Sequence, residues 1–522
     1  MKLTLGGYAC LVVTFMIFVT LSAPGKTGNA ALLEAHSLNL GWEDANSAIT
    51  EWQVQSGESE WVSLVTRDAP ASVISRHLLL EGFGSAADGS WKATGAGLTF
   101  NGTLAGGRLS VRQTLAPVEG EYRLRYRVHI ENVSSAPLRS DSDQTLRLHL
   151  GPGLGEYPTD GYGIADTLYS FVEPVVSIGK EVRRMSLQEA GDTAVQDLAD
   201  PEALDWAGLH SRYFALVVAP ERGNGVNAID VRLPDEEAAT SLPPRYLPSI
   251  VLQVPTQVLK PQESVTREFL IFSGPKSGSA LAEGVGDFSG LSFAGMWNWL
   301  RGLCICLLTI LGLIHSMVPN WGISIILLAV LVRLALYPIA QRAMASQHAF
   351  SEVQKTIQPE LRDIKNNYRG EEQSERILAL YQRYSVSPLA GLKPLLIVLI
   401  QIPVFVALFH VLGQAYELRA TPFLWIESLA EPDRLFSLGI SVPYFGSHFN
   451  LLPILLAFTT LLTIKMAPAP AADESARYRQ NIFLVIMALG FLVLFYPFPS
   501  GMVLYWTVAN LLHLAQQYIV EH

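Results

Sequence analysis

Six apolar runs in the second half of the 522-residue chain constrain its fold more than any other feature. They lie at 303–318, 321–340, 394–412, 451–466, 481–498 and 502–520. A helix needs about 20 mostly apolar residues to cross the ~30 Å hydrocarbon core of a bilayer. Backbone in lipid must satisfy its own hydrogen bonds, so such runs cross as helices. The runs therefore predict an all-α membrane region, in which only the role of the first run is ambiguous.

The region before these runs has a different composition. Between residues 24 and 290 there are 34 acidic and 21 basic residues and no cysteine. Alternation of apolar and polar residues, clearest in EYRLRYRVHIEN (121–132), is typical of strands with one buried face. Several such segments, separated by Gly, Pro and Asn turns, predict a large antiparallel β-sandwich over 24–290.

Loop charges predict how the chain is oriented in the membrane. The loop at 341–393 carries eight Lys and Arg residues, whereas the loop at 413–450 carries only two. Because cytoplasmic loops are enriched in Lys and Arg, we place the first loop in the cytoplasm and the acidic sandwich outside. The number of crossings between them must then be odd. We therefore predict that residues 291–320 lie along the membrane interface instead of crossing.

The chain begins with a further apolar segment. Residues 3–23 contain no charged side chain and follow a single lysine. At about 20 residues the segment is long enough to span a bilayer and long for the apolar part of a signal peptide. We predict a transmembrane anchor at 1–23, with a cleaved signal peptide as the alternative. Together with five spans in 321–522, the anchor gives six crossings and places both chain ends in the cytoplasm.

One arginine, Arg333, interrupts the run at 321–340. A charge at the centre of a membrane helix costs at least ~2.5–3.5 kcal/mol, so such residues usually face a bundle interior or a water-filled cavity. Arg333 lies 12 residues after Trp321, or roughly 18 Å along a helix, in the predicted cytoplasmic half of the bilayer. A polar cavity and snorkelling to the interface both remain open from this pattern.

The cytoplasmic loop has a helical pattern of its own. Apolar residues recur at three- and four-residue steps in two stretches on either side of NNYRGEE. This pattern predicts a helical hairpin at 341–386 with a narrow apolar seam. Such a hairpin either packs only on itself or also offers a docking surface.

The membrane region contains five notable blocks, which are, in order, NWGISIILLAVLVRLALYPI, QPELRDIKNNYRGEEQSERILALYQRYSVSPLAGLKPLL, LIQIPVFVALFHVL, ELRATPFLWIESLAEPD and YPFPSGMVLYWTVANLLHLAQQ. Together they resemble the YidC family of membrane protein insertases, and the resemblance runs from about Trp297 to the end of the chain. Weaker matches in the acidic region, DWAGLHSRYFALVVAP and SGPKS, resemble the periplasmic domain of Gram-negative members.

The resemblance implies a multi-pass protein of the bacterial inner membrane that inserts nascent membrane-protein clients, alone or with a Sec-type translocon. It implies an all-α core of five helices around a hydrophilic groove, beside an all-β periplasmic sandwich. It also implies an insertase without an enzyme's chemistry. The residues implied to contact the client are Arg333, Gln401, Tyr505 and Trp506. One departure is Ala329, where other members carry a hydroxyl one turn before the arginine.

Two other classes of protein are alternatives. A secondary transporter would also contain a buried arginine, but no inverted repeat is visible. A membrane-anchored carbohydrate-binding protein would suit the sandwich, but no His/Glu pair for such a cleft can be identified. The histidines lack metal-site spacing and the cysteines, Cys10, Cys304 and Cys306, form no C-x-x-C pair. We therefore predict no catalytic residue, no metal and no cofactor.

Charge also bears on ribosome binding. After Val520 the sequence has only Glu521 and His522, without the basic tail that many members append. The eight basic residues of the 341–393 loop are offset by six acidic ones. Because phosphate contacts supply most of the attraction to RNA, we expect ribosome contact to be weak or transient, with no recognition of a specific nucleic-acid sequence.

Overall fold

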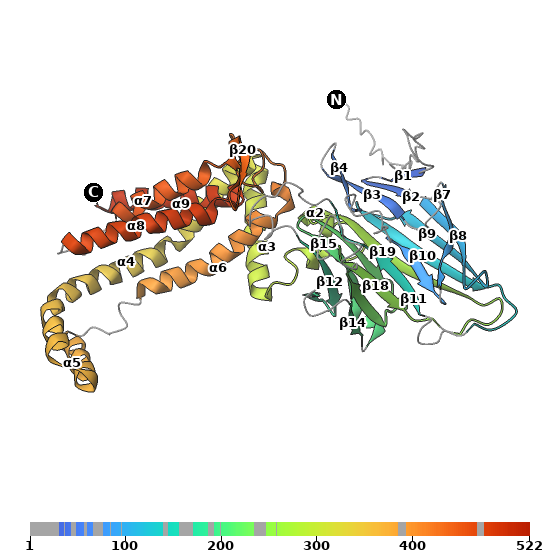
Figure 1. Ribbon diagram of the computed structural model, residues 1–522, viewed down its shortest axis with the longest axis horizontal. Helices are drawn as coiled ribbons and strands as arrows, with labels where there is room; N and C mark the ends of the chain where they lie inside the picture. The colour runs from blue at the N-terminus through green and yellow to red at the C-terminus, as the bar shows by residue number, and fades with distance from the viewer. Residues whose placement is uncertain are drawn as a thin grey trace, which may run out of the picture. The chain divides into compact units, whose positions relative to one another are not determined.

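In the computed structural model the chain forms two compact units (Figure 1). One unit holds the described residues up to Gly295, and the other those from Met296 onward. The anchor predicted at 1–23 lies outside the described residues. The structure describes residues 31–35, 37–42, 49–56, 60–65, 77–83, 85–94, 97–138, 145–155, 171–185, 193–198, 200–233, 247–256, 258–384, 393–466 and 474–521.

The first unit is an antiparallel β-sandwich, which confirms the sequence prediction. A nine-stranded sheet has the order β13 (Glu181–Arg184), β12 (Val172–Ile178), β15 (Leu204–Ser211), β16 (Phe214–Pro220), β19 (Ser264–Pro275), β10 (Arg123–Asn132), β9 (Leu109–Pro117), β8 (Gly97–Leu104) and β7 (Asp88–Thr94). A six-stranded sheet has the order β14 (Thr193–Asp197), β17 (Ala228–Arg232), β18 (Ser249–Val254), β11 (Leu146–Leu150), β5 (Leu79–Gly82) and β6 (Ser85–Ala86). A smaller sheet contains β1 (Ala31–Ala35), β2 (Leu38–Trp42), β3 (Ile49–Ser56) and β4 (Glu60–Ser63).

Strand β10 shows why the alternating pattern folds in this way. Leu124 and Tyr126 are buried, and Val128 and Ile130 continue the same inward face two residues apart. Successive side chains of a strand point to opposite faces. On the outward face Arg127 pairs with Glu268 of β19 at 2.6 Å. Each strand therefore buries its apolar side chains and leaves its ionic ones near water.

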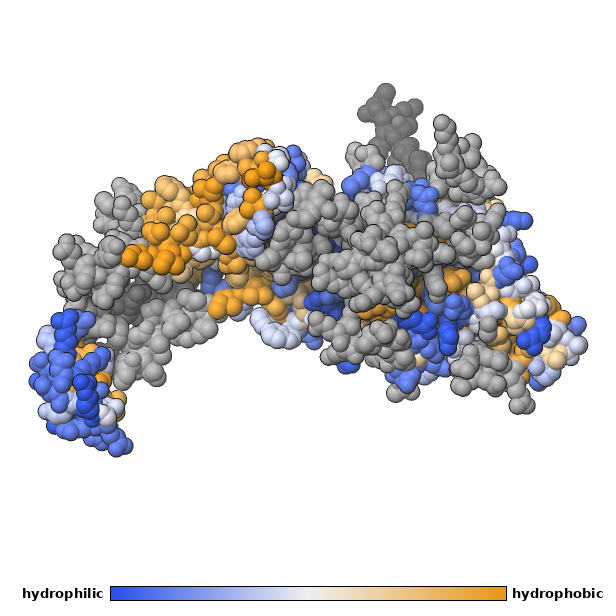
Figure 2. All heavy atoms as spheres, viewed as in Figure 1, coloured by the Kyte–Doolittle hydropathy of each residue, from blue (hydrophilic) through white to orange (hydrophobic). Residues whose placement is uncertain are grey.

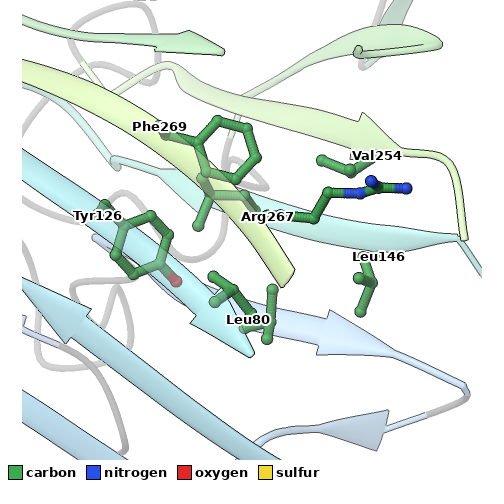
Figure 3. A pocket seen from close by; sticks show the side chains of 8 residues that line it. Leu80, Tyr126, Leu146, Val254, Arg267 and Phe269 are labelled. Carbon is green, nitrogen blue, oxygen red and sulfur yellow. The ribbon is translucent and has the colours of Figure 1, made fainter. Parts of the chain in front are cut away.

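The two main sheets pack closely against one another. Tyr126 and Phe269 of the nine-stranded sheet face Leu80 and Leu146 of the six-stranded sheet across a small cavity (Figure 3). Its volume is about 10 Å³ and its lining is almost entirely apolar, apart from the side chain of Arg267. A space of this size holds at most about one water molecule. It is far too small for a sugar.

His77, just before β5, makes the stability of the sandwich depend on pH. Its side chain is 0% exposed, and its Nδ1 accepts a hydrogen bond from the backbone N–H of Gly151 at 3.1 Å. Burial lowers the pKa of His77 from 6.5 to about 4. Between these values the unfolded chain binds the proton and the folded one does not, so the free energy of unfolding falls as the pH is lowered from 6.5 to 4.

We expect this loss to reach about 3 kcal/mol for His77 alone. Chemical unfolding followed by tryptophan fluorescence at pH 7.5, 5.5 and 4 measures it. His77→Gln should show a smaller decline over this range, because glutamine does not titrate. A decline of equal size in the variant and the natural protein would contradict the assignment to His77.

The second unit consists mainly of helices, as predicted. The helices are α3 (Asn298–Met317), α4 (Trp321–Asn367), α5 (Gly370–Arg383), α6 (Lys393–Gln414), α7 (Leu452–Met466), α8 (Glu474–Phe495) and α9 (Ser500–Glu521). Helices α4, α6, α7, α8 and α9 run alongside one another, and α3 runs across them (Figure 1). A two-stranded hairpin, β20 (Phe436–Val442) and β21 (Gly446–Phe449), precedes α7.

Within the described part of the chain, two segments are long and apolar enough to cross a bilayer by length and composition, namely Asn298–Met317 and Trp321–Pro338. Three shorter apolar stretches follow at Gln401–Gln414, Leu452–Thr463 and Val485–Phe495. The first segment, α3, buries one face that includes Cys304, whose thiol lies 3.7 Å from the carbonyl of Ala407 in α6. The interfacial position predicted for 291–320 stays a prediction.

Helix α4 extends well beyond the apolar run that predicted it. Asn320 caps its first turn, where its side-chain oxygen accepts from the N–H of Ile323 at 3.0 Å. The helix then continues for 47 residues, so the predicted span and the first arm of the predicted hairpin are one helix. Tyr384, just after α5, donates a hydrogen bond to Glu360 of α4 at 3.1 Å, and Leu380 of α5 is buried. The hairpin thus packs on itself along the apolar seam.

Candidate functional site

Arg333 lies on the inner side of α4. Leu328 and Ala329 are buried, and Arg333, one turn after Ala329, is half-buried on the same face. Leu331 and Leu334 on the other sides of the helix are exposed. A snorkelling arginine would extend along the outer surface. The position of Arg333 therefore favours the interior of the bundle.

The polar partners of Arg333 come from α9. Nη2 of Arg333 forms a hydrogen bond with Nδ1 of His513. A guanidinium can only donate, so this bond requires His513 to be neutral with its proton on Nε2. Tyr505, which is buried, lies on the same helix as His513. Tyr505 and His513 are eight residues apart, about two helical turns, and thus share one face of α9.

Trp506 belongs to a different group of side chains. Its ring lies 4.9 Å from that of Phe405 in α6, and 5.2 Å and 6.1 Å from those of Phe495 and Phe491 in α8, measured between centroids. Gln401, half-buried on α6, precedes Phe405 by one turn. The four predicted residues therefore fall into two groups, Arg333 with Tyr505 and Trp506 beside the turn that carries Gln401.

The end of the bundle away from the α4–α5 hairpin is held by a buried carboxylate. Oδ2 of Asp433 accepts hydrogen bonds from the backbone N–H groups of Leu451 at 2.8 Å and Leu452 at 2.9 Å. It also accepts from the indole N–H of Trp425 at 3.2 Å. These bonds satisfy the first N–H groups of α7. The connection between α6 and α7 is thereby fixed across the end of the bundle.

Sequence reasoning missed His513 and Asn510. Asn510 of α9 donates a hydrogen bond to the hydroxyl of Thr460 in α7 at 2.9 Å. Both residues are uncharged, so they do not stand out in an apolar run as Arg333 does. The three-residue spacing of Asn510 and His513, which places both on one side of a helix, was the available signal. His513 also supplies a polar group near Arg333, where Ala329 lacks the hydroxyl expected from the resemblance.

Two family models match most of the chain. The description 60Kd inner membrane protein matches residues 313–522, and the description YidC periplasmic domain matches residues 86–307. This chain belongs to the YidC family of membrane protein insertases. The family resemblance seen in the five sequence blocks is thereby confirmed, and so is the combination of a periplasmic-type sandwich with a helical membrane region.

Individual YidC relatives agree with this membership. The chain is 31% identical to the membrane protein insertase YidC of Syntrophobacter fumaroxidans, over 72% of this chain and 66% of the relative. It is 28% identical to that of Syntrophus aciditrophicus, over 81% of this chain and 69% of the relative. The chain thus spans about two thirds of the length of these relatives. A crystal structure of an active YidC insertase is 16% identical, with a TM-score of 0.36 over 95% of this chain and 93% of that chain.

Proposed function

We propose that this protein is a membrane protein insertase that receives client transmembrane segments at the polar face shared by α4 and α9 and releases them into the bacterial inner membrane. The observation that carries the proposal is the placement of Arg333 on the inner side of the bundle, bonded to His513. Gln401, Tyr505 and Trp506 complete the client-contacting wall. The function needs no covalent step and no cofactor.

The proposed mechanism follows from two free-energy terms. Moving a polar or acidic client segment through hydrocarbon is costly, and a polar wall with one positive charge lowers that cost. The apolar segment of the client then leaves into lipid, where burial of apolar surface contributes about 25 cal/mol per Å². Arg333 attracts the polar segment of the client, and the hydrophobic effect drives the apolar segment into the lipid.

We also propose an orientation for the chain. The sandwich lies in the periplasm, the α4–α5 hairpin lies in the cytoplasm, and α3 lies along the membrane surface. The crosswise direction of α3 supports this placement (Figure 1). So does the exposure of Trp297 and Trp299 at its start, since tryptophan is enriched at membrane interfaces. Figure 2 shows hydrophilic side chains gathered on α5. Membrane-protein clients are the principal partners, with a Sec translocon as a second partner.

Reconstitution tests the proposed function directly. Purified protein in lipid vesicles should insert a single-span client with an acidic translocated segment, scored by protease protection against vesicles that lack the protein. A photoreactive group at Trp506 should crosslink to the client during insertion. A secondary transporter would not raise insertion of the client and would not crosslink to it. This result would reject the proposal.

His513 provides a more specific prediction. His513→Ala removes the hydrogen-bond acceptor beside Arg333 and should reduce insertion of the acidic client about tenfold, because a hydrogen bond to a charged group contributes roughly 1.5 kcal/mol or more. His513→Asn should retain more activity, since its amide oxygen still accepts. His410→Ala is the matched control, because His410 lies in α6 and bonds to Gln414 instead (3.0 Å). Equal losses in all three variants would contradict the role of His513.

A further inference from the structure

The β20–β21 hairpin carries an apolar face that the described residues leave uncovered. Strand β20 reads FSLGISV, in which Phe436, Leu438 and Ile440 alternate with Ser and Gly. The pairing of β20 with β21 is irregular between Ser437 and Val442, and Gly439 has a φ of 69°, so the strand bends there. Phe436, Leu438 and Ile440 are all exposed, at 52%, 39% and 67%.

Contacts hold this hairpin against the end of α8. The hydroxyl of Tyr444, at its tip, lies 3.5 Å from the carbonyl oxygen of Leu494, within α8. The ring of Phe445 meets that of Tyr496 at 5.0 Å between centroids. At the base of the hairpin, Phe436 stacks on Phe449 at 4.9 Å. These contacts hold the hairpin beside the C-terminal end of α8.

The tip of the hairpin adjoins the exposed apolar end of α8. Leu489, Val493 and Leu494 of α8 are exposed, and Leu494 is the residue that the hairpin tip contacts. Figure 2 shows hydrophobic side chains over this part of the bundle. From Leu435 to Phe449 the sequence contains no Asp, Glu, Lys or Arg. A large uncharged apolar surface of this kind marks a membrane or protein contact.

We infer that the β20–β21 hairpin lies in the extracytoplasmic leaflet of the membrane, with Phe436, Leu438 and Ile440 turned toward the lipid chains. This inference rests on the proposed placement of α8 across the membrane. Phospholipid is the occupant that continuity with α8 favours. The outer edges of a two-stranded sheet leave backbone N–H and C=O groups without strand partners, which lipid chains cannot satisfy. The hairpin therefore lies at the boundary between headgroups and chains, with Ser437 and Ser441 nearer the headgroups.

Spin labels on the full-length protein in phospholipid nanodiscs test this position. Cys10, Cys304 and Cys306 are first replaced by alanine, and single cysteines are then introduced by Leu438→Cys and Ile440→Cys. Ser437→Cys and Ser441→Cys place the label at neighbouring polar positions of the same strand. Collision with oxygen, which concentrates in lipid, is compared with collision with a water-soluble nickel chelate.

We expect labels at 438 and 440 to collide mainly with oxygen, and labels at 437 and 441 to shift toward the nickel chelate. Leu489→Cys on α8 provides the lipid reference, and Val133→Cys, an exposed apolar position on the sandwich, provides the water reference. Nickel access at 438 and 440 equal to that at 133 would overturn the inference in favour of a water-exposed hairpin. Exclusion of both probes would overturn it in favour of a protein partner.

The references separate failure of the inference from failure of the proposed topology. If the label at 489 also behaves as it does in water, the placement of α8 in the membrane is wrong. If 489 reports lipid while 438 and 440 do not, only the hairpin inference is wrong. Normal helical content of each variant by circular dichroism excludes misfolding as the cause.

Discussion

Replacing Arg333 by alanine is expected to reduce insertion of a client with an acidic translocated segment by tenfold or more. Hydrogen bonds to a charged group contribute roughly 1.5–3 kcal/mol, which corresponds to about 10- to 100-fold. Arg333→Lys keeps the positive charge and should retain more activity than alanine. Arg333→Glu should be worst, because it repels the client segment and leaves His513 without its donor. Protease protection of the client in reconstituted vesicles measures each effect.

Two controls isolate the charge at this position. Arg376→Ala removes an arginine from the exposed surface of α5, where it pairs with Glu372 at 3.0 Å, and should leave insertion nearly unchanged. A client whose translocated segment is neutral should lose less activity in Arg333→Ala than the acidic client does. Equal insertion by Arg333→Ala and the natural protein would mean that Arg333 only snorkels.

Arg123→Ala is expected to lower the free energy of unfolding of the sandwich by roughly 3–5 kcal/mol, because it leaves several buried carbonyls without a donor. Arg123 begins β10 and is only 1% exposed. Its Nη1 donates to the carbonyl of Ala280 at 2.9 Å, and its Nη2 donates to that of Leu281 at 3.2 Å. Its Nε donates to the carbonyl of Val285 at 2.9 Å. Two of these acceptors belong to the short helix α2 (Gly278–Ala282).

A matched arginine makes this prediction specific. Arg112 of β9 is exposed and bonds only weakly to Asn101, at 3.3 Å, so Arg112→Ala should cost well under 1 kcal/mol. Arg123→Lys keeps the charge but cannot reproduce the fork of guanidinium donors, and it should fall between the two alanine variants. Urea unfolding followed by tryptophan fluorescence measures all three. Equal stability of the two alanine variants would show that these bonds contribute little.

Local periodicity explains which parts of the fold could be predicted. The alternation in 121–132 predicted β10, and the apolar runs predicted helices in the second unit, because burial on one side of a strand or within lipid leaves a short-range pattern. The order of strands in a sheet leaves no such short-range pattern. Strand β10 pairs with β19, with Tyr126 opposite Phe269, and nothing local to either strand specifies that partner. The sandwich could therefore be predicted, but the order of its strands could not.

The candidate site was predictable only in part, for a related reason. Arg333 is a charge in an apolar run, which costs free energy and so stands out. His513 is neutral and 180 residues away along the chain, and its role depends on the packing of α9 against α4. The end of α4 could not be predicted either, because hydropathy falls after Ala340 while the helix continues to Asn367. Hydropathy reports the surroundings of a helix and not its length.

The continuity of α4 places Arg333 and the hairpin on one helix. Two prolines, Pro338 and Pro359, lie between Arg333 and the end of this helix at Asn367, and each removes one backbone hydrogen bond. Helices bend most readily at such positions. Pro338 lies about 8 Å from Arg333 and about 44 Å from Asn367 along the helix. Bending at either proline would let the hairpin follow whatever α5 touches while Arg333 keeps its bond with His513.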